Sequence, residues 1–80
     1  MPIDREALEK LLADLRGERE EAEAVGSRAA ERLVRLAAGH ADLSDVDAAI
    51  VRSAAEDFAT AVEKLKLLKE WTRRVRGLLT

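Results

Sequence analysis

The chain has 80 residues, enough for one domain covering residues 1–80 and too few for a large hydrophobic core, so we expect a partner to add buried surface. It has no cysteine, which excludes disulfides, and its one histidine cannot supply a structural zinc site without non-His ligands or other chains. The net charge of -2, from 16 acidic and 14 basic residues, provides no general attraction to nucleic acid or to an anionic membrane. The longest run without a charged residue, Leu36 to Ala41, is far too short to cross a bilayer, so we expect a cytoplasmic protein.

The first predicted helix covers residues 5–38. Asp4 is a good N-cap residue. Gly39, four residues after Arg35, is predicted to end the helix in the left-handed conformation that glycine adopts easily. A break at Gly26-Ser27 is the alternative and would give a three-helix bundle. A continuous helix is favoured because the seven-residue apolar repeat passes this point without a change of phase.

The second predicted helix covers residues 45–78. Ser44, followed three residues later by Asp47, approximates a capping box. An apolar repeat of seven residues runs along each predicted helix: its members are Leu8, Leu15, Ala22, Ala29 and Leu36 in the first, and Val51, Phe58, Leu65 and Leu79 in the second, where Thr72 interrupts it. Two helices of matched length with a short connection predict an all-α antiparallel helical hairpin.

The turn also predicts which residues lie at the same level of the two helices. If it centres between Ala41 and Asp42, facing residues have numbers that add up to about 83. Gly26 then faces Phe58, so we expect the missing side chain of this glycine to make room for the aromatic ring. A cavity at Gly26 that binds a small apolar ligand is a weaker hypothesis.

The apolar faces are wider than one hairpin can bury. We therefore expect two hairpins to form a four-helix bundle, with a homodimer as the simplest arrangement and a different helical protein as the alternative partner. The predicted core or interface residues are Leu8, Leu11, Leu12, Leu15, Val25, Leu33, Leu36, Ile50, Val51, Phe58, Val62, Leu65, Leu68, Trp71 and Val75.

Two charged residues, Glu18 and Arg19, fall on or beside the apolar stripe of the first helix. A polar pair in such a stripe can fix helix register or partner number, and Gly26 is a third candidate for this role. The alternative is that both long side chains reach past the stripe to solvent.

Six cations gather near the C-terminus, at Lys64, Lys66, Lys69, Arg73, Arg74 and Arg76. They complement the helix dipole, and we expect Asp4, Glu6, Glu9 and Asp14 of the antiparallel helix to neutralise them in part, which makes nucleic-acid binding unlikely.

His40 follows Gly39 and is interpreted as a capping or solvated residue. No catalytic, cofactor-binding or metal-binding set can be assembled, so we expect a non-enzymatic structural or interaction module.

The Asp4-capped helix, the Gly39 stop and the Ser44-capped helix together resemble antiparallel helical hairpins that dimerise into four-helix bundles. This resemblance covers the whole chain and implies an architecture without transferring functional residues. The economy of the chain also resembles de novo designed bundles, although Gly17 and Gly26 depart from that habit. A designed scaffold should unfold very late on heating, and melting below about 65 °C would count against that origin.

Overall fold

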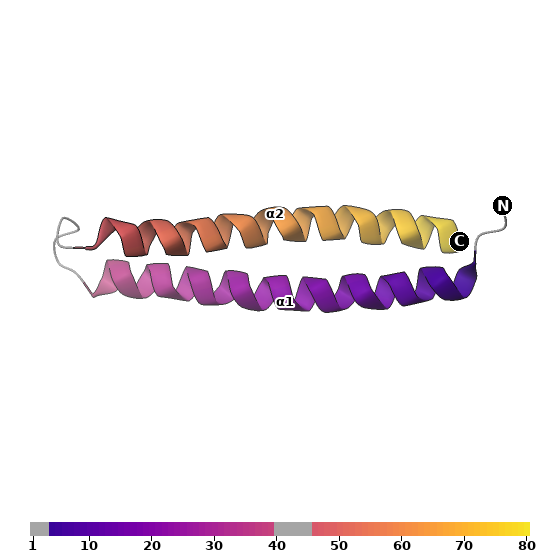
Figure 1. Cartoon of the computed structure of the whole chain (residues 1–80), viewed down its shortest axis with the longest axis horizontal. Coiled ribbons are helices and arrows are strands. Elements are labelled where there is room, and N and C mark those ends of the chain that lie inside the picture. Colours follow the sequence, from indigo (N-terminus) through magenta and orange to yellow (C-terminus); the bar gives the residue numbers. More distant parts are fainter. Residues whose placement is uncertain (1–3, 40–45) are drawn as a thin grey trace.

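The computed structural model describes residues 4–39 and 46–80, which form two long α-helices. Helix α1 covers Arg5–Ala38, and helix α2 covers Ala48–Leu79. The helices lie side by side and antiparallel, so the first turn of α1 and the last turn of α2 are at the same end of the molecule (Figure 1). The predicted all-α hairpin is therefore confirmed, and the unbroken α1 excludes the three-helix alternative.

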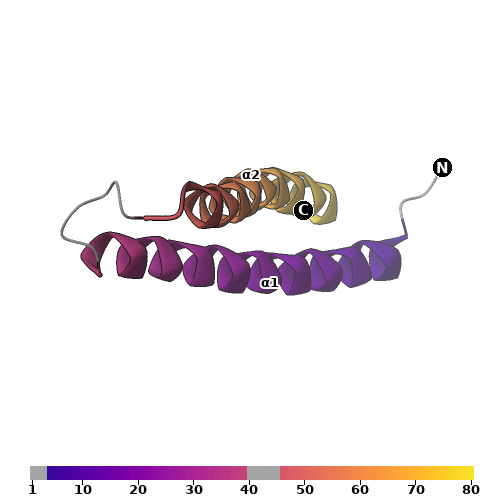
Figure 2. The ribbon, with the colours of Figure 1, turned by 60° about the vertical axis from the view of Figure 1, so that its left-hand side comes forward.

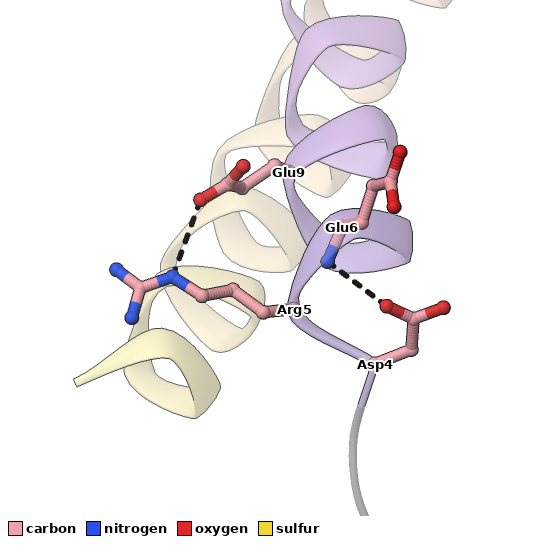
Figure 3. A network of polar contacts seen from close by, with 4 residues as sticks. All are labelled: Asp4, Arg5, Glu6 and Glu9. Atoms are coloured by element: carbon pink, nitrogen blue, oxygen red, sulfur yellow. Dashed lines mark hydrogen bonds and ion pairs between the residues drawn. The ribbon is translucent and has the colours of Figure 1, made fainter.

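Helix α1 has the predicted bounds. At its start the Asp4 carboxylate accepts a hydrogen bond from the Glu6 amide at 3.0 Å, and Arg5 pairs with Glu9 at 3.3 Å (Figure 3). At its end the Gly39 amide donates to the Arg35 carbonyl at 2.9 Å. The predicted left-handed conformation of Gly39 is wrong, because its φ of -79° continues the right-handed path of the helix.

Helix α2 begins three residues later than predicted. Asp47 has extended backbone angles, and its carboxylate accepts a hydrogen bond from the Ala49 amide at 2.9 Å. Aspartate caps a helix as well as serine does, so the sequence offered two possible starts and the later one applies. Ser44 and His40, which the sequence assigned to capping roles, lie outside the described residues.

The two helices meet along residues spaced alternately by three and four positions, here called the seam. In Figure 2 helix α2 is more foreshortened than α1, so their axes are inclined, as in coiled-coil packing. All seam residues except Phe58 are buried or half-buried. They are Leu8, Leu12, Leu15, Arg19, Ala22, Gly26, Ala29, Leu33 and Leu36 on α1, and Val51, Ala54, Phe58, Ala61, Leu65, Leu68, Thr72, Val75 and Leu79 on α2.

Small residues form most of the buried part of the seam. The buried apolar side chains are Ala22, Ala29, Ala54, Ala61, Leu68 and Val75, and Gly26 is buried beside them. Small side chains let the helix backbones approach closely, at the expense of the apolar area that a single hairpin can bury.

The predicted contact between Gly26 and Phe58 is wrong. A Cβ atom placed on Gly26 would lie 3.2 Å from the Cβ of Ala61, and no Phe58 atom comes within 4 Å of it. Ala61 lies about one helical turn from Phe58, whose side chain is 40% exposed. Gly26 therefore allows close helix packing and leaves no room there for a ring or a ligand.

Two glycines of α1 provide a matched test of this packing. We expect Gly17→Ala to raise the free energy of unfolding by about 1 kcal/mol, since alanine favours a helix and the new Cβ meets nothing within 4 Å. Gly26→Ala should raise the free energy of unfolding by much less, because the new methyl group would press on Ala61. Urea unfolding of both variants at one protein concentration measures the difference, and an equal gain would contradict the close contact.

None of the described helices is both long and apolar enough to span a membrane.

Candidate interaction surface

One exposed side of the hairpin consists of two rows of residues, one on each helix, here called the Glu18–Lys64 face. Spacing by three and four positions keeps each row on one side of its helix. Every residue of both rows is exposed. The α1 row is Leu11, Asp14, Glu18, Glu21, Val25, Arg28 and Arg32, and the α2 row is Ile50, Ser53, Asp57, Thr60, Lys64, Leu67, Trp71, Arg74 and Leu78.

Contacts between the helices show that the two rows are neighbours. Near the middle of the hairpin the Lys64 Nζ atom lies 2.8 Å from the Glu18 Oε2 atom. A shallow groove of about 210 Å³ brings Glu21 and Val25 together with Asp57 and Lys64. A second groove, closer to the turn, is lined by Val25, Arg28, Ala29, Arg32, Ala54 and Asp57. The rows therefore form one continuous surface that crosses both helices.

Most of the exposed apolar side chains lie on this face. Among the described residues eight large apolar side chains are exposed, and six of them belong to its two rows: Leu11, Val25, Ile50, Leu67, Trp71 and Leu78. The other two are Val34 and Phe58. Scattered exposed leucines are ordinary, but a concentration on one side of a small protein is typical of an interaction surface.

Glu18 and Arg19, predicted to act as a polar pair in the apolar stripe, have separate surroundings. Glu18 points to the Glu18–Lys64 face and pairs with Lys64 of the other helix. Arg19 is a half-buried seam residue whose Nε atom is shielded from solvent, lacks a hydrogen-bond partner and lies 3.9 Å from Glu23. Their role in register or partner number stays a prediction, and among the described residues the Glu18–Lys64 pair is the ion pair that joins the two helices.

The pair makes the lysine a useful probe of the face. A hydrogen bond and the negative charge of Glu18, with a smaller contribution from Glu21, raise the pKa of Lys64 above its ordinary value of 10.5. Because the folded-state pKa is the higher one, the stabilising effect is complete below pH 10.5 and is lost as the pH rises through the folded-state pKa.

We therefore expect Glu18→Gln to lower the pKa of Lys64 toward 10.5. An NMR titration of the lysine Nζ signals measures this shift. The control is Glu63→Gln, which removes a carboxylate of α2 that makes no ion pair among the described residues and should leave the Lys64 titration in place. Equal titration of Lys64 in the wild type and in Glu18→Gln would contradict the pairing.

The C-terminal cations are not neutralised as predicted. Lys64 pairs with Glu18, and Arg74 pairs with Glu70 of its own helix at 2.9 Å. The other four cations form no ion pair with the described residues, and they line a groove on α2 together with Arg19, Glu70 and Thr72: Lys66, Lys69, Arg73 and Arg76. Asp4, Glu6, Glu9 and Asp14 do not pair with them, and Glu9 pairs with Arg5 of its own helix instead.

The predicted core or interface residues divide into three groups in the single chain. Leu68 and Val75 are buried in the seam. Eight are half-buried: Leu8, Leu12, Leu15, Leu33, Leu36, Val51, Val62 and Leu65. Five are exposed: Leu11, Val25, Ile50, Phe58 and Trp71. All of these five except Phe58 lie on the Glu18–Lys64 face, where only a partner could bury them.

Sequence reasoning missed several charged members of this face. Asp57, Arg28 and Arg32 line one groove, and none was singled out as a site residue. The sequence did contain a signal for them. From Asp14 to Arg32, residues spaced alternately by four and three positions lie on one side of the helix, and they are acidic in one half of this row and basic in the other.

The described part of the chain brings together no group of three or more His, Cys, Asp or Glu side chains suited to a metal ion.

No match was found among protein-family models, curated proteins or solved structures. The class that the fold defines is the all-α antiparallel helical hairpin.

Proposed function

We propose that this protein is a non-enzymatic interaction module, located in the cytoplasm, that self-associates through the Glu18–Lys64 face into a homodimeric four-helix bundle. The observation that carries the proposal is that, of the eight large apolar side chains exposed in the described residues, six lie on this one face. Pairing two such faces would complete a second apolar layer beside each seam.

The extended shape of the single chain supports the proposal. A compact monomer of 8.8 kDa exposes about 4,800 Å² of surface, whereas this chain exposes 6406 Å². This excess of about 1,600 Å² on one chain is about twice the 800 Å² that each partner buries in a standard protein interface. The radius of gyration is 18.0 Å, against about 12 Å for a compact domain of this length.

The composition of the seam supports it as well. Among the described residues, four of the six buried apolar side chains are alanines, and none of the large side chains is almost completely buried. Burial of apolar area is the main stabilising term in folding, and alanine contributes little of it. An isolated hairpin with this core would be marginally stable, whereas the dimer would bury the leucine, isoleucine and tryptophan side chains of the face.

Light scattering over a hundredfold range of protein concentration tests the proposal. A molar mass near twice 8.8 kDa, together with melting that rises with concentration, is the expected result. A cooperatively folded monomer over the whole range would overturn the homodimer and favour a different helical protein as the partner of the same face.

A second candidate function is binding of a polyanion such as nucleic acid. It is favoured by the groove on α2 in which Lys66, Lys69, Arg73 and Arg76 lack ion-pair partners among the described residues. Four phosphate contacts predict that the logarithm of the binding constant falls with the logarithm of salt concentration with a slope of about -3 to -4. Fluorescence anisotropy with a labelled oligonucleotide measures this slope, and the absence of binding at low salt would exclude the function.

A further inference from the structure

We propose that the second copy of the chain docks on the Glu18–Lys64 face rotated about the long axis of the hairpin, so that α1 of each copy packs against α2 of the other and the two turns lie at the same end. This inference rests on the proposed self-association and adds its orientation. Two stacked hairpins can be related by a two-fold axis in two simple ways, the other being an end-over-end rotation that places the turns at opposite ends.

Opposite charges at the same level of the hairpin make the face complementary to itself. Glu18 on α1 pairs with Lys64 on α2 in the half that holds the chain ends, and Arg28 and Arg32 line a groove with Asp57 in the half that holds the turn. Rotation about the long axis places the α2 row of the second copy over the α1 row of the first at the same level. Each copy would then repeat these pairings across the interface.

Charge alone does not select this orientation. The α1 row is acidic from Asp14 to Glu21 and basic from Arg28 to Arg32, so an end-over-end copy would also bring opposite charges together. Asp14 of one copy would then lie near Arg32 of the other. The apolar residues of the face have to distinguish the two orientations.

The apolar side chains are distributed unequally along the face. Trp71, Leu78 and Leu11 lie in the half that holds the chain ends, and Leu67 lies just on that side of the middle of α2. The turn half holds the other two, Val25 and Ile50, and the α2 positions of the face between Ile50 and Lys64 are the polar residues Ser53, Asp57 and Thr60.

Rotation about the long axis superimposes the apolar half of one copy on the apolar half of the other. End-over-end rotation would instead bury Trp71 against the segment that contains Ser53 and Asp57. An interface core depleted of charge and enriched in aromatic residues is the usual arrangement, so the long-axis rotation fits the face better.

Spin labelling of the whole chain tests this orientation. The sequence has no cysteine, so Gly77→Cys and Ala48→Cys each provide a single attachment point for a nitroxide label. Both residues are exposed at opposite ends of α2, outside the two rows of the face, and a Cβ atom on Gly77 meets nothing within 4 Å. Pulsed dipolar spectroscopy then measures the distance between the two labels of a dimer.

We expect both variants to give label distances below about 30 Å, since helices packed 8–10 Å apart keep equivalent residues at the same end. End-over-end packing would give about 40 Å or more for both variants, at 1.5 Å per residue on each side of the middle of α2. Distances in this longer range would overturn the proposed orientation and leave self-association intact. The absence of dipolar coupling at concentrations where light scattering shows only monomer would overturn both.

Discussion

Replacing Ala54 by leucine is expected to lower the free energy of unfolding by about 2–3 kcal/mol. Ala54 is 0% exposed and lies in the seam, where its side chain lines a groove with Ala29 on the opposite helix. Leucine adds three carbon atoms at a point where small residues set the distance between the helix axes. The added volume has to separate the helices or force a strained side-chain conformation.

Ala59→Leu is the matched control for this change. Ala59 lies on the same helix and is exposed, and leucine has nearly the helix propensity of alanine, so the free energy of unfolding should change by less than about 0.5 kcal/mol. Chemical unfolding followed by circular dichroism, with all variants at one protein concentration, provides the comparison. Equal effects at the two positions would mean that the helices do not approach closely at Ala54.

The sequence was sufficient to predict the helices and much of the seam, because these features depend on local signals. Asp4 and Gly39 bracket α1, and both predicted bounds of this helix are confirmed. The start of α2 was misplaced because Ser44 and Asp47 are both suitable caps. A sequence does not specify which of two caps three residues apart reaches an unpaired amide.

Contacts between the helices were harder to predict, because they depend on three-dimensional register. Pairing residues by number placed Phe58 against Gly26, whereas Ala61, about one turn further along α2, makes that contact. The sum of residue numbers gives an approximate level along the hairpin, but it does not specify which of two seam residues one turn apart makes the contact. A glycine beside an alanine, with the aromatic ring partly in solvent, brings the helix backbones closer than the predicted contact would allow.

Charge pairing shows the same limit of sequence reasoning. The acidic N-terminal segment and the basic C-terminal segment were expected to neutralise each other because they are adjacent. Instead Arg5 pairs with Glu9 and Arg74 with Glu70, each within one helix. Partners four residues apart on one helix are always within reach, whereas partners on another helix must also lie on the facing side. Lys64 and Glu18 meet that condition, whereas Arg76 lines a groove with Leu12 and Glu20 of α1 without forming an ion pair among the described residues.

Trp71→Ala is expected to weaken self-association by about 2 kcal/mol or more, an increase in the dimer dissociation constant of about 30-fold or more. Trp71 belongs to the Glu18–Lys64 face and is 48% exposed in the single chain, with Arg74 placed 5.4 Å from the centre of its ring. About 100 Å² of its surface would be available to a second copy, worth about 2.5 kcal/mol at the usual coefficient for apolar burial. A position among Leu67, Leu78 and Leu11 would exclude water from this contact.

Val34→Ala is the control that separates this effect from general loss of apolar surface. Val34 is 66% exposed, more than Trp71, yet it lies outside the Glu18–Lys64 face, so its truncation should change the dissociation constant by less than about twofold. Sedimentation equilibrium measures the constant for both variants, and circular dichroism at high concentration establishes that each remains helical. If dimers form but both substitutions weaken them equally, Trp71 is not an anchor, and the chains associate through a different surface.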